Sequence, residues 1–326
     1  MNYLILSYNN FEFRGRNTMM KTEKILSLLF LLIVNAVVSA ATYENKSINI
    51  NGIERNYVLK YPKTYDHNGK LPLIIALHGG GSNWRKFNTG TSKLTLQKAA
   101  DREQVLLIFP AGKDQHWNDG RGKNLAGKHK YDDIAFISQL IDLAIADYQV
   151  DADKVFVTGM SNGGFMAIRL ALELSAKISA VAAVAAQMSV NIAHLNIAQP
   201  LSFMLINGTD DPIVPFAGGE MKPFKFSKSK GLLLSSRATV DYFVKHNHCQ
   251  RPAKTKTQDN RRFDKTSLLI RSYTECATNS RVEFITVRGG GHTWPGGKQY
   301  LPIGLIGRLS REIDAGAEIM AFFLQK

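Results

Sequence analysis

The chain has 326 residues, of which 44% are hydrophobic and 21% are charged, so it can bury a full core and is neither fibrous nor broadly disordered. Its formal net charge is +14, but the basic residues are scattered and no nucleic-acid-binding motif accompanies them. This pattern favours a generally basic solvated surface over a nucleic-acid partner.

An apolar run of residues 25–38 lies near the N-terminus. Lys21 and Lys24 precede it, and the small residues of Val38-Ser39-Ala40-Ala41 follow it. The run is short for a membrane span, and the small residues suit signal peptidase. We therefore predict that residues 1–40 form a cleaved signal peptide, the alternative being an uncleaved anchor.

Translation is expected to start at Met1 or, in a more usual signal-peptide context, at Met19 or Met20. Cleavage would leave 37 basic and 25 acidic residues, a net charge of +12, in a mature chain of residues 41–326. The predicted location is secreted or periplasmic, with no membrane association after cleavage.

The mature chain begins with strand patterns. Residues 46–50 and 53–61 are strand-like and are joined by Asn51-Gly52, a strong hairpin signal. Residues 71–77 form a continuous apolar run, typical of a strand covered on both faces, and end in His78-Gly79-Gly80-Gly81-Ser82. Three glycines after a buried strand can expose backbone N–H groups to a cavity, or form only a flexible turn.

Strand and helix patterns then alternate to the end of the chain. We expect strands at 105–109, 155–158, 180–186, 203–206 and 282–287, and helices at 132–148, 165–172, 235–245 and 313–324. This alternation predicts an α/β fold with a mostly parallel, doubly wound sheet and an antiparallel N-terminal hairpin, in a single domain. Asp132-Asp133 is explained by helix capping rather than by metal binding.

The motif Gly159-Met160-Ser161-Asn162-Gly163 lies between the strand pattern 155–158 and a helix pattern. In a tight strand-to-helix turn, the serine hydroxyl projects from the end of the strand and small residues must flank it. Ser161 is therefore a candidate nucleophile. The N–H of Asn162 and that of Gly80 are candidate oxyanion-hole donors.

A serine nucleophile needs a base and an acid that orients the base. Asp210 and Asp211 follow the strand pattern that ends at Ile206, and His292 follows the one that ends at Val287. The chain order Ser, Asp, His is the order used by α/β-hydrolases.

Six segments together carry a family resemblance that covers nearly all of residues 45–326. They are His78-Gly79-Gly80-Gly81, Trp117-Asn118-Asp119-Gly120-Arg121, residues 132–136, residues 159–164, residues 208–215 and Gly290-Gly291-His292-Thr293-Trp294-Pro295-Gly296. This set resembles the secreted α/β-hydrolase esterases that include poly(3-hydroxybutyrate) depolymerase-like and feruloyl esterases.

The resemblance implies that Ser161 is the nucleophile, His292 the base and Asp211 the acid, with Asp210 as the rival acid. Its cysteine pair is similar to Cys249 and Cys276. An even number of cysteines in an exported chain independently favours a disulfide, the alternative being two separate buried thiols.

Two departures from the family pattern are present. Phe109-Pro110-Ala111-Gly112 lacks an aspartate that the family often has there, and Gly159 stands where dedicated polymer depolymerases commonly have alanine. Trp117 and Trp294 are the candidate substrate-facing aromatics, against the alternative of core or rim packing.

The sequence thus predicts a serine carboxylesterase that needs no cofactor or metal and acts through an acyl-enzyme. The expected substrates are small or oligomeric esters, free or polysaccharide-linked: hydroxyalkanoate oligomers or hydroxycinnamoyl esters, in preference to insoluble polyester. The alternatives are an acetylxylan esterase, a serine peptidase on the same fold, and a catalytically idle polysaccharide- or polyester-binding protein. Loops 112–130 and 217–234 are expected to determine the acyl and alcohol specificity.

Overall fold

The structure is a computed structural model that describes residues 43–66, 68–122, 131–222, 227–250 and 253–325. The predicted signal peptide lies outside the described residues and stays a prediction. Residues 41–326 form one compact unit.

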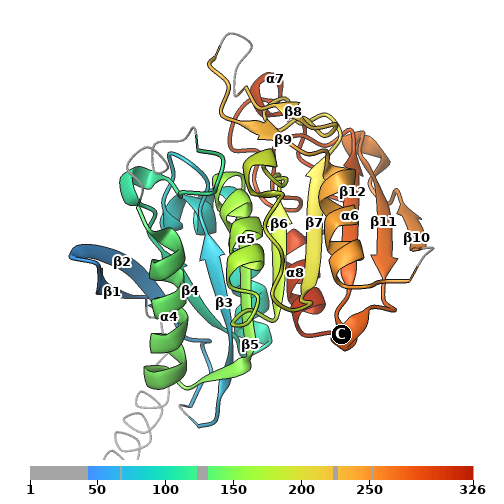
Figure 1. The fold of residues 1–326 in the computed structure, drawn as a ribbon. Coiled ribbons are helices and arrows are strands. Elements are labelled where there is room, and N and C mark those ends of the chain that lie inside the picture. The colour runs from blue at the N-terminus through green and yellow to red at the C-terminus, as the bar shows by residue number, and fades with distance from the viewer. Residues whose placement is uncertain (1–42, 67, 123–130, 223–226, 251–252, 326) are drawn as a thin grey trace, which may run out of the picture. The chain divides into compact units, whose positions relative to one another are not determined.

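A mixed sheet of ten strands runs through this unit in the order β1-β2-β4-β3-β5-β6-β7-β12-β11-β10 (Figure 1). The strands from β4 to β12 in this order pair in parallel and form the centre of the sheet. Their bounds are Leu106–Pro110 (β4), Leu71–Leu77 (β3), Val150–Met160 (β5), Ala180–Val184 (β6), Ser202–Gly208 (β7) and Val282–Arg288 (β12). The predicted parallel sheet is confirmed.

Antiparallel strands flank this centre on both sides. At one edge, β1 (Tyr43–Ile50) and β2 (Ile53–Lys60) form the predicted hairpin. At the other edge, β11 (Ser267–Tyr273) and β10 (Lys254–Gln258) were not predicted. The sequence of β10 is Lys-Thr-Lys-Thr-Gln and most of it is exposed, so it offers no apolar alternation from which a strand could be recognised.

Helices cover both faces of the sheet, and a separate apolar core lies between the sheet and the helices on each face. On one face lie α4 (Asp133–Asp147), α5 (Asn162–Glu173) and α6 (Ser236–His246). On the other lie α8 (Ala315–Phe323) and α2 (Thr95–Arg102), which pack against each other. The sequence did not indicate α2, a short helix in which only Leu96, Ala99 and Ala100 bury apolar side chains.

The two acids at the start of α4 have different roles. Asp132 caps the helix by accepting a hydrogen bond from the Ala135 N–H at 2.8 Å, as predicted. Asp133 instead forms a buried ion pair of 2.6 Å with Arg55 of β2 and accepts the Asn118 N–H. Capping therefore explains only Asp132, whereas Asp133 fastens α4 to the edge hairpin and to the loop that contains Asn118.

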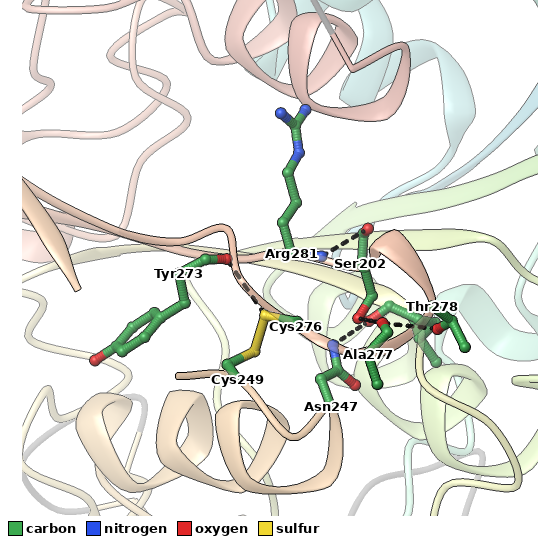
Figure 2. Close-up of a disulfide and its surroundings, with 10 residues drawn as sticks. Ser202, Asn247, Cys249, Tyr273, Cys276, Ala277, Thr278 and Arg281 are labelled. Atoms are coloured by element: carbon green, nitrogen blue, oxygen red, sulfur yellow. Dashed lines mark hydrogen bonds between the residues drawn. A yellow bond between two sulfur atoms is a disulfide. The ribbon is translucent and has the colours of Figure 1, made fainter. Parts of the chain in front are cut away.

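Cys249 and Cys276 form a disulfide, shown in Figure 2. Cys249 follows α6, and Cys276 lies between β11 and β12. A backbone hydrogen bond of 2.8 Å from Ala277 to Asn247 runs beside the disulfide. The bond therefore links the end of α6 to the antiparallel edge of the sheet.

Short elements gather beyond the carboxyl ends of the parallel strands, where Figure 1 shows α7, β8 and β9 above the strand arrowheads. The short elements at this end are Ile303–Ile306 (α7), Gly219–Glu220 (β8), Leu232–Leu233 (β9), Lys86–Thr91 (η1), Lys113–Gln115 (η2), Val190–Ile192 (η3) and Arg262–Asp264 (η4). The remaining one, Ala277–Asn279 (η5), lies at the opposite end, immediately before β12. Within the described ranges, no helix has the length and apolar character needed to cross a membrane.

Candidate active site

Ser161 lies at a sharp turn between β5 and α5. Its backbone has φ 55° and ψ −124°, a conformation that L-residues rarely adopt. Two hydrogen bonds hold the turn: the Ser161 N–H donates to Val184 O of β6, and Ser161 O accepts the Phe165 N–H that opens the helix. The side chain is half-buried and lines the main pocket. Such strain at a serine is typical of a nucleophile turn.

The glycines of the motif allow this turn because β3, β5 and α5 approach closely there. A Cβ on Gly159 would lie 2.5 Å from the Gly163 carbonyl carbon. A Cβ on Gly163 would overlap the Leu77 carbonyl at the end of β3. Steric exclusion therefore explains both glycines.

His292 and Asp211 meet at the carboxyl ends of β12 and β7. His292 Nδ1 lies 2.7 Å from Asp211 Oδ2, and the side chains are almost fully buried. Asp211 Oδ1 accepts the N–H groups of Ile213 and Val214, each at 2.8 Å. Asp210 is exposed, and among the described residues its carboxylate accepts a hydrogen bond only from the neighbouring Thr209 hydroxyl. The structure thus pairs His292 with Asp211 rather than with Asp210.

The carboxylate partner sets the tautomer of His292. A carboxylate can only accept, so Nδ1 carries the proton and donates it to Asp211. Nε2 is then the basic nitrogen, and His292 lines the same pocket as Ser161. The Tyr300 hydroxyl donates to the His292 carbonyl at 2.8 Å and adds a backbone restraint.

The two candidate oxyanion donors lie side by side. A Cβ on Gly80 would be 3.4 Å from Asn162 Cβ, and both residues line the pocket. In the part of the chain that the structure describes, neither the Gly80 N–H nor the Asn162 N–H has a hydrogen-bond acceptor. Two unused N–H groups beside the serine are what an oxyanion hole requires.

The buried His78 side chain links the glycine loop to the segment that follows β4 through two hydrogen bonds. Its Nδ1 lies 2.8 Å from Gly79 O and its Nε2 lies 3.0 Å from the Gly112 N. The carbonyl only accepts and the amide only donates, so the imidazole must be neutral to satisfy both partners. Burial lowers the pKa of His78 to about 4, which favours this neutral state.

Trp117 joins this loop to Asn162. Its indole N–H donates to His78 O at 2.9 Å, and its backbone N–H and carbonyl pair with the Asn162 amide at 2.8 and 3.1 Å. The prediction that Trp117 faces substrate is wrong, because the side chain is fully buried in the core. Its position instead connects the segments that carry the two candidate oxyanion donors.

A buried ion pair extends the same network. The Asn162 amide also donates to Asp119 Oδ2 at 2.5 Å, and Arg121 donates to that oxygen from Nε at 2.9 Å and from Nη2 at 2.6 Å. The Arg121 guanidinium also lies over the Phe165 ring of α5. The side chain of Asn162 is therefore fixed on every polar atom.

Trp294 is also a core residue. It is fully buried, packs edge-on against Phe87 at 5.4 Å, and donates its indole N–H to Thr95 of α2. The substrate-facing prediction is wrong here as well. The prediction relied on the proximity of Trp294 to His292 in sequence, but the chain turns inward toward α2 immediately after the histidine.

One pocket of about 1230 Å³ contains Ser161, Asn162, His292 and the loop of Gly79, Gly80 and Gly81. The sequence did not single out several of its other lining residues, although the first three lie in loops 112–130 and 217–234, which were expected to determine specificity: His116, Arg121, Met221, Lys298, Tyr300 and Leu301. Arg121 lies in the Trp117–Arg121 motif and could have been found there. The others come from loops whose sequences carry no periodicity. Among the described residues, no group of three or more His, Cys, Asp or Glu side chains could hold a metal ion.

The parallel sheet, the serine turn and the Asp–His pair at the strand ends define an α/β-hydrolase. The comparison with protein families agrees. Residues 49–275, more than half of the chain, match the family described as "Putative esterase", and the chain belongs to that family.

The chain is also similar to individual esterases in sequence and to a solved structure in fold. The putative esterase NocK of Nocardia uniformis is 27% identical over 78% of this chain and 74% of its own. A probable feruloyl esterase C of Aspergillus clavatus is 31% identical over 57% of this chain, and the match spans just under two thirds, 65%, of that enzyme. An acetyl xylan esterase structure from Aspergillus awamori shares the fold with a TM-score of 0.55 at 13% identity, covering 87% of this chain and all of that one.

Proposed function

We propose that this protein is a serine carboxylesterase exported by its N-terminal segment. The observation that carries the proposal is the arrangement of one pocket: a strained serine, a histidine paired with a buried carboxylate, and two unused backbone N–H groups. The esterase family and relatives named as feruloyl esterases support ester hydrolysis as the reaction.

The reaction follows from the roles of these groups. His292 Nε2 takes the Ser161 hydroxyl proton as Oγ attacks the ester carbonyl, and the N–H groups of Asn162 and Gly80 hold the negative oxygen. His292 then gives the proton to the leaving alcohol, and the ester C–O bond breaks. A water molecule, deprotonated by His292, attacks the acyl-enzyme and releases the acid and free Ser161. Asp211 orients His292 and stabilises its charged form.

The proposed substrates are hydroxyalkanoate oligomers or hydroxycinnamoyl esters. A pocket of about 1230 Å³ exceeds what a drug-sized ligand needs, so it has room for an ester with more than one building block. The names of the feruloyl esterase relatives favour the hydroxycinnamoyl class.

A substrate panel tests the proposal. Hydrolysis of p-nitrophenyl acyl esters, methyl ferulate, acetylated xylan and hydroxybutyrate oligomers is measured for the wild type and for Ser161→Ala. Turnover of methyl ferulate or the oligomers that Ser161→Ala abolishes supports it. Turnover of acetylated xylan alone would favour an acetylxylan esterase. No turnover of any ester, with retained binding to polysaccharide or polyester, would indicate a binding protein.

A further inference from the structure

The charges around the pocket are all of one sign. Among the described residues, five basic side chains line the pocket and no aspartate or glutamate does: Arg85, Lys86, Arg121, Lys230 and Lys298. A pocket lined by one sign of charge raises the local concentration of substrates of the opposite sign. The lining is therefore suited to an anionic substrate.

These basic groups differ in how much charge they leave available. Arg121 is buried and paired with Asp119, so its charge is largely compensated. The other four side chains are exposed, and within the described part of the chain none forms an ion pair with a carboxylate. The Arg85 guanidinium lies over the Trp84 ring, 5.1 Å from its centroid, but this contact brings no opposite charge, so all four charges remain available to an anionic ligand.

Three of the free charges come from one wall. Arg85 and Lys86 open η1, and the Lys298 N–H donates to Thr91 O at the other end of η1 at 3.0 Å. Two residues after Lys298, the Tyr300 hydroxyl donates to the His292 carbonyl at 2.8 Å. The wall formed by η1 and residues 298–301 is therefore joined to the catalytic base. Lys230 belongs to another side of the pocket, because its N–H bonds to Met221 O and Met221 contacts Arg121.

The chemistry of ester cleavage indicates which part of the substrate lies against this wall. His292 must reach the leaving oxygen to protonate it, so the alcohol portion of the ester lies on the His292 side of Ser161. We propose, on the basis of the proposed serine esterase function, that the enzyme selects esters whose alcohol portion carries a carboxylate. Lys298, Lys86 and Arg85 are the specificity-determining residues.

Two kinds of ester have this chemistry. In a hydroxy-acid oligomer, the leaving alcohol is itself a hydroxy acid with a free carboxylate. In an ester formed on a hydroxyl group of a uronic acid, the leaving alcohol is a sugar that carries a free carboxylate. Leu301 lines the same wall and is 46% exposed, which adds apolar contact beside the charges. This combination suits the short aliphatic hydroxy acid better than the polar sugar.

The experiment compares pairs of substrates in which a neutral group of similar size replaces the carboxylate. The first pair is 3-(butyryloxy)butanoate and its primary amide, which have the same acyl group and nearly the same shape. The second pair is a feruloyl ester of methyl galacturonoside and the corresponding ester of methyl galactoside. We expect the acid of the first pair to be hydrolysed with a kcat/KM at least about fivefold above that of its amide, mainly through KM.

Variants then locate the effect. Lys298→Gln is expected to reduce the acid-to-amide ratio by about threefold, and the triple variant Arg85→Gln, Lys86→Gln, Lys298→Gln to bring it close to one. In each variant, kcat/KM for the acid should fall by a larger factor than kcat/KM for the amide, which serves as the reference for any general effect of the substitution. Lys70→Gln is the matched control, because this exposed lysine precedes the amino end of β3, whereas the pocket lies at the carboxyl ends of the parallel strands. An ionic strength of about 1 M, where the Debye length is about 3 Å, should also remove the preference.

The results separate this inference from the esterase function itself. Equal hydrolysis of acid and neutral members in both pairs, or a preference that survives the triple variant, would overturn the inference and leave the esterase intact. A preference within the uronic pair alone would keep the carboxylate rule and reject the hydroxy acid as its source. If Ser161→Ala hydrolyses all four esters as fast as the wild type, the proposed function fails first.

Discussion

Asp211 and Asp210 are neighbouring carboxylates whose surroundings predict different roles. Asp211 is buried and bonded to His292, whereas Asp210 is exposed. We expect Asp211→Ala to lower kcat roughly 10³-fold, less than Ser161→Ala or His292→Ala, because His292 loses its orientation but stays present. Asp210→Ala should change kcat less than about threefold. Steady-state kinetics on a p-nitrophenyl ester checks this, and equal losses at both positions would reject Asp211 as the acid.

His78 should make the fold sensitive to mild acid. Its pKa is about 4 in the folded protein against an ordinary 6.5, so the unfolded chain binds more protons between these values. The free energy of unfolding is therefore undiminished above pH 6.5 and falls as the pH drops toward 4, by up to about 3 kcal/mol. Protonation would place an N–H against the Gly112 N–H and break that hydrogen bond.

Urea unfolding at pH 7 and pH 4.5 measures the effect. His78→Gln should be less stable than the wild type at pH 7 but lose less stability on acidification. The exposed His194→Gln is the control and should follow the wild type. Parallel pH profiles for the wild type and His78→Gln would show that His78 does not titrate in this way.

The residues of the site differ in how far the sequence could predict them. Ser161 and His292 follow strands in motifs with few alternative readings, so the sequence predicts their positions. The choice of Asp211 over the adjacent Asp210 depends on the family resemblance. Trp117 and Trp294 could not be placed, because a tryptophan near a catalytic residue in sequence can point toward the pocket or the core. Only the partners of their indole groups, His78 and Thr95, decide between the two.

At the scale of elements, the disulfide between Cys249 and Cys276 restrains the edge of the sheet next to α6. In the chain-entropy model, a bond with a sequence separation of 27 contributes roughly 3–4 kcal/mol to stability. Reduction should therefore lower the melting temperature by roughly 5–15 °C. Thermal unfolding with and without dithiothreitol measures this, and the double variant Cys249→Ser, Cys276→Ser should show no response to reductant. Two alkylated cysteines in the unreduced wild type would rule the bond out.

The buried strands and long helices were predictable because their apolar residues repeat at the period of each element. The elements that were missed have little to bury. Exposed polar residues make up most of β10. In α2, Leu96 is the only buried apolar residue that is larger than alanine. Their structure depends on neighbours that are distant in sequence: β10 pairs with β11, and α2 packs against α8.

At the scale of the whole molecule, the ends of the parallel strands gather the catalytic groups, and the loops above them form the pocket walls. Leu301, Ile303 and Leu305 are 46–49% exposed on and beside α7, next to this pocket. This apolar surface could not be read from the sequence, and exposed apolar area of this kind is what binding to an insoluble polyester would require, so it bears directly on the expected preference for soluble esters. Part of the net charge of +14 lies on the pocket wall. The position of the basic residues, rather than the total charge, therefore bears on substrate binding.

Covalent labelling tests most directly whether Ser161 is the nucleophile of an ester hydrolase. The purified protein is treated with a fluorophosphonate, its mass is measured, the modified peptide is sequenced, and residual esterase activity is followed. Ser82→Ala is the matched control, because Ser82 lines the same pocket. We predict one adduct per chain on Ser161, loss of activity in proportion to labelling, no labelling of Ser161→Ala, and normal labelling of Ser82→Ala. An adduct on another residue, or ester hydrolysis that persists in Ser161→Ala, would contradict the account.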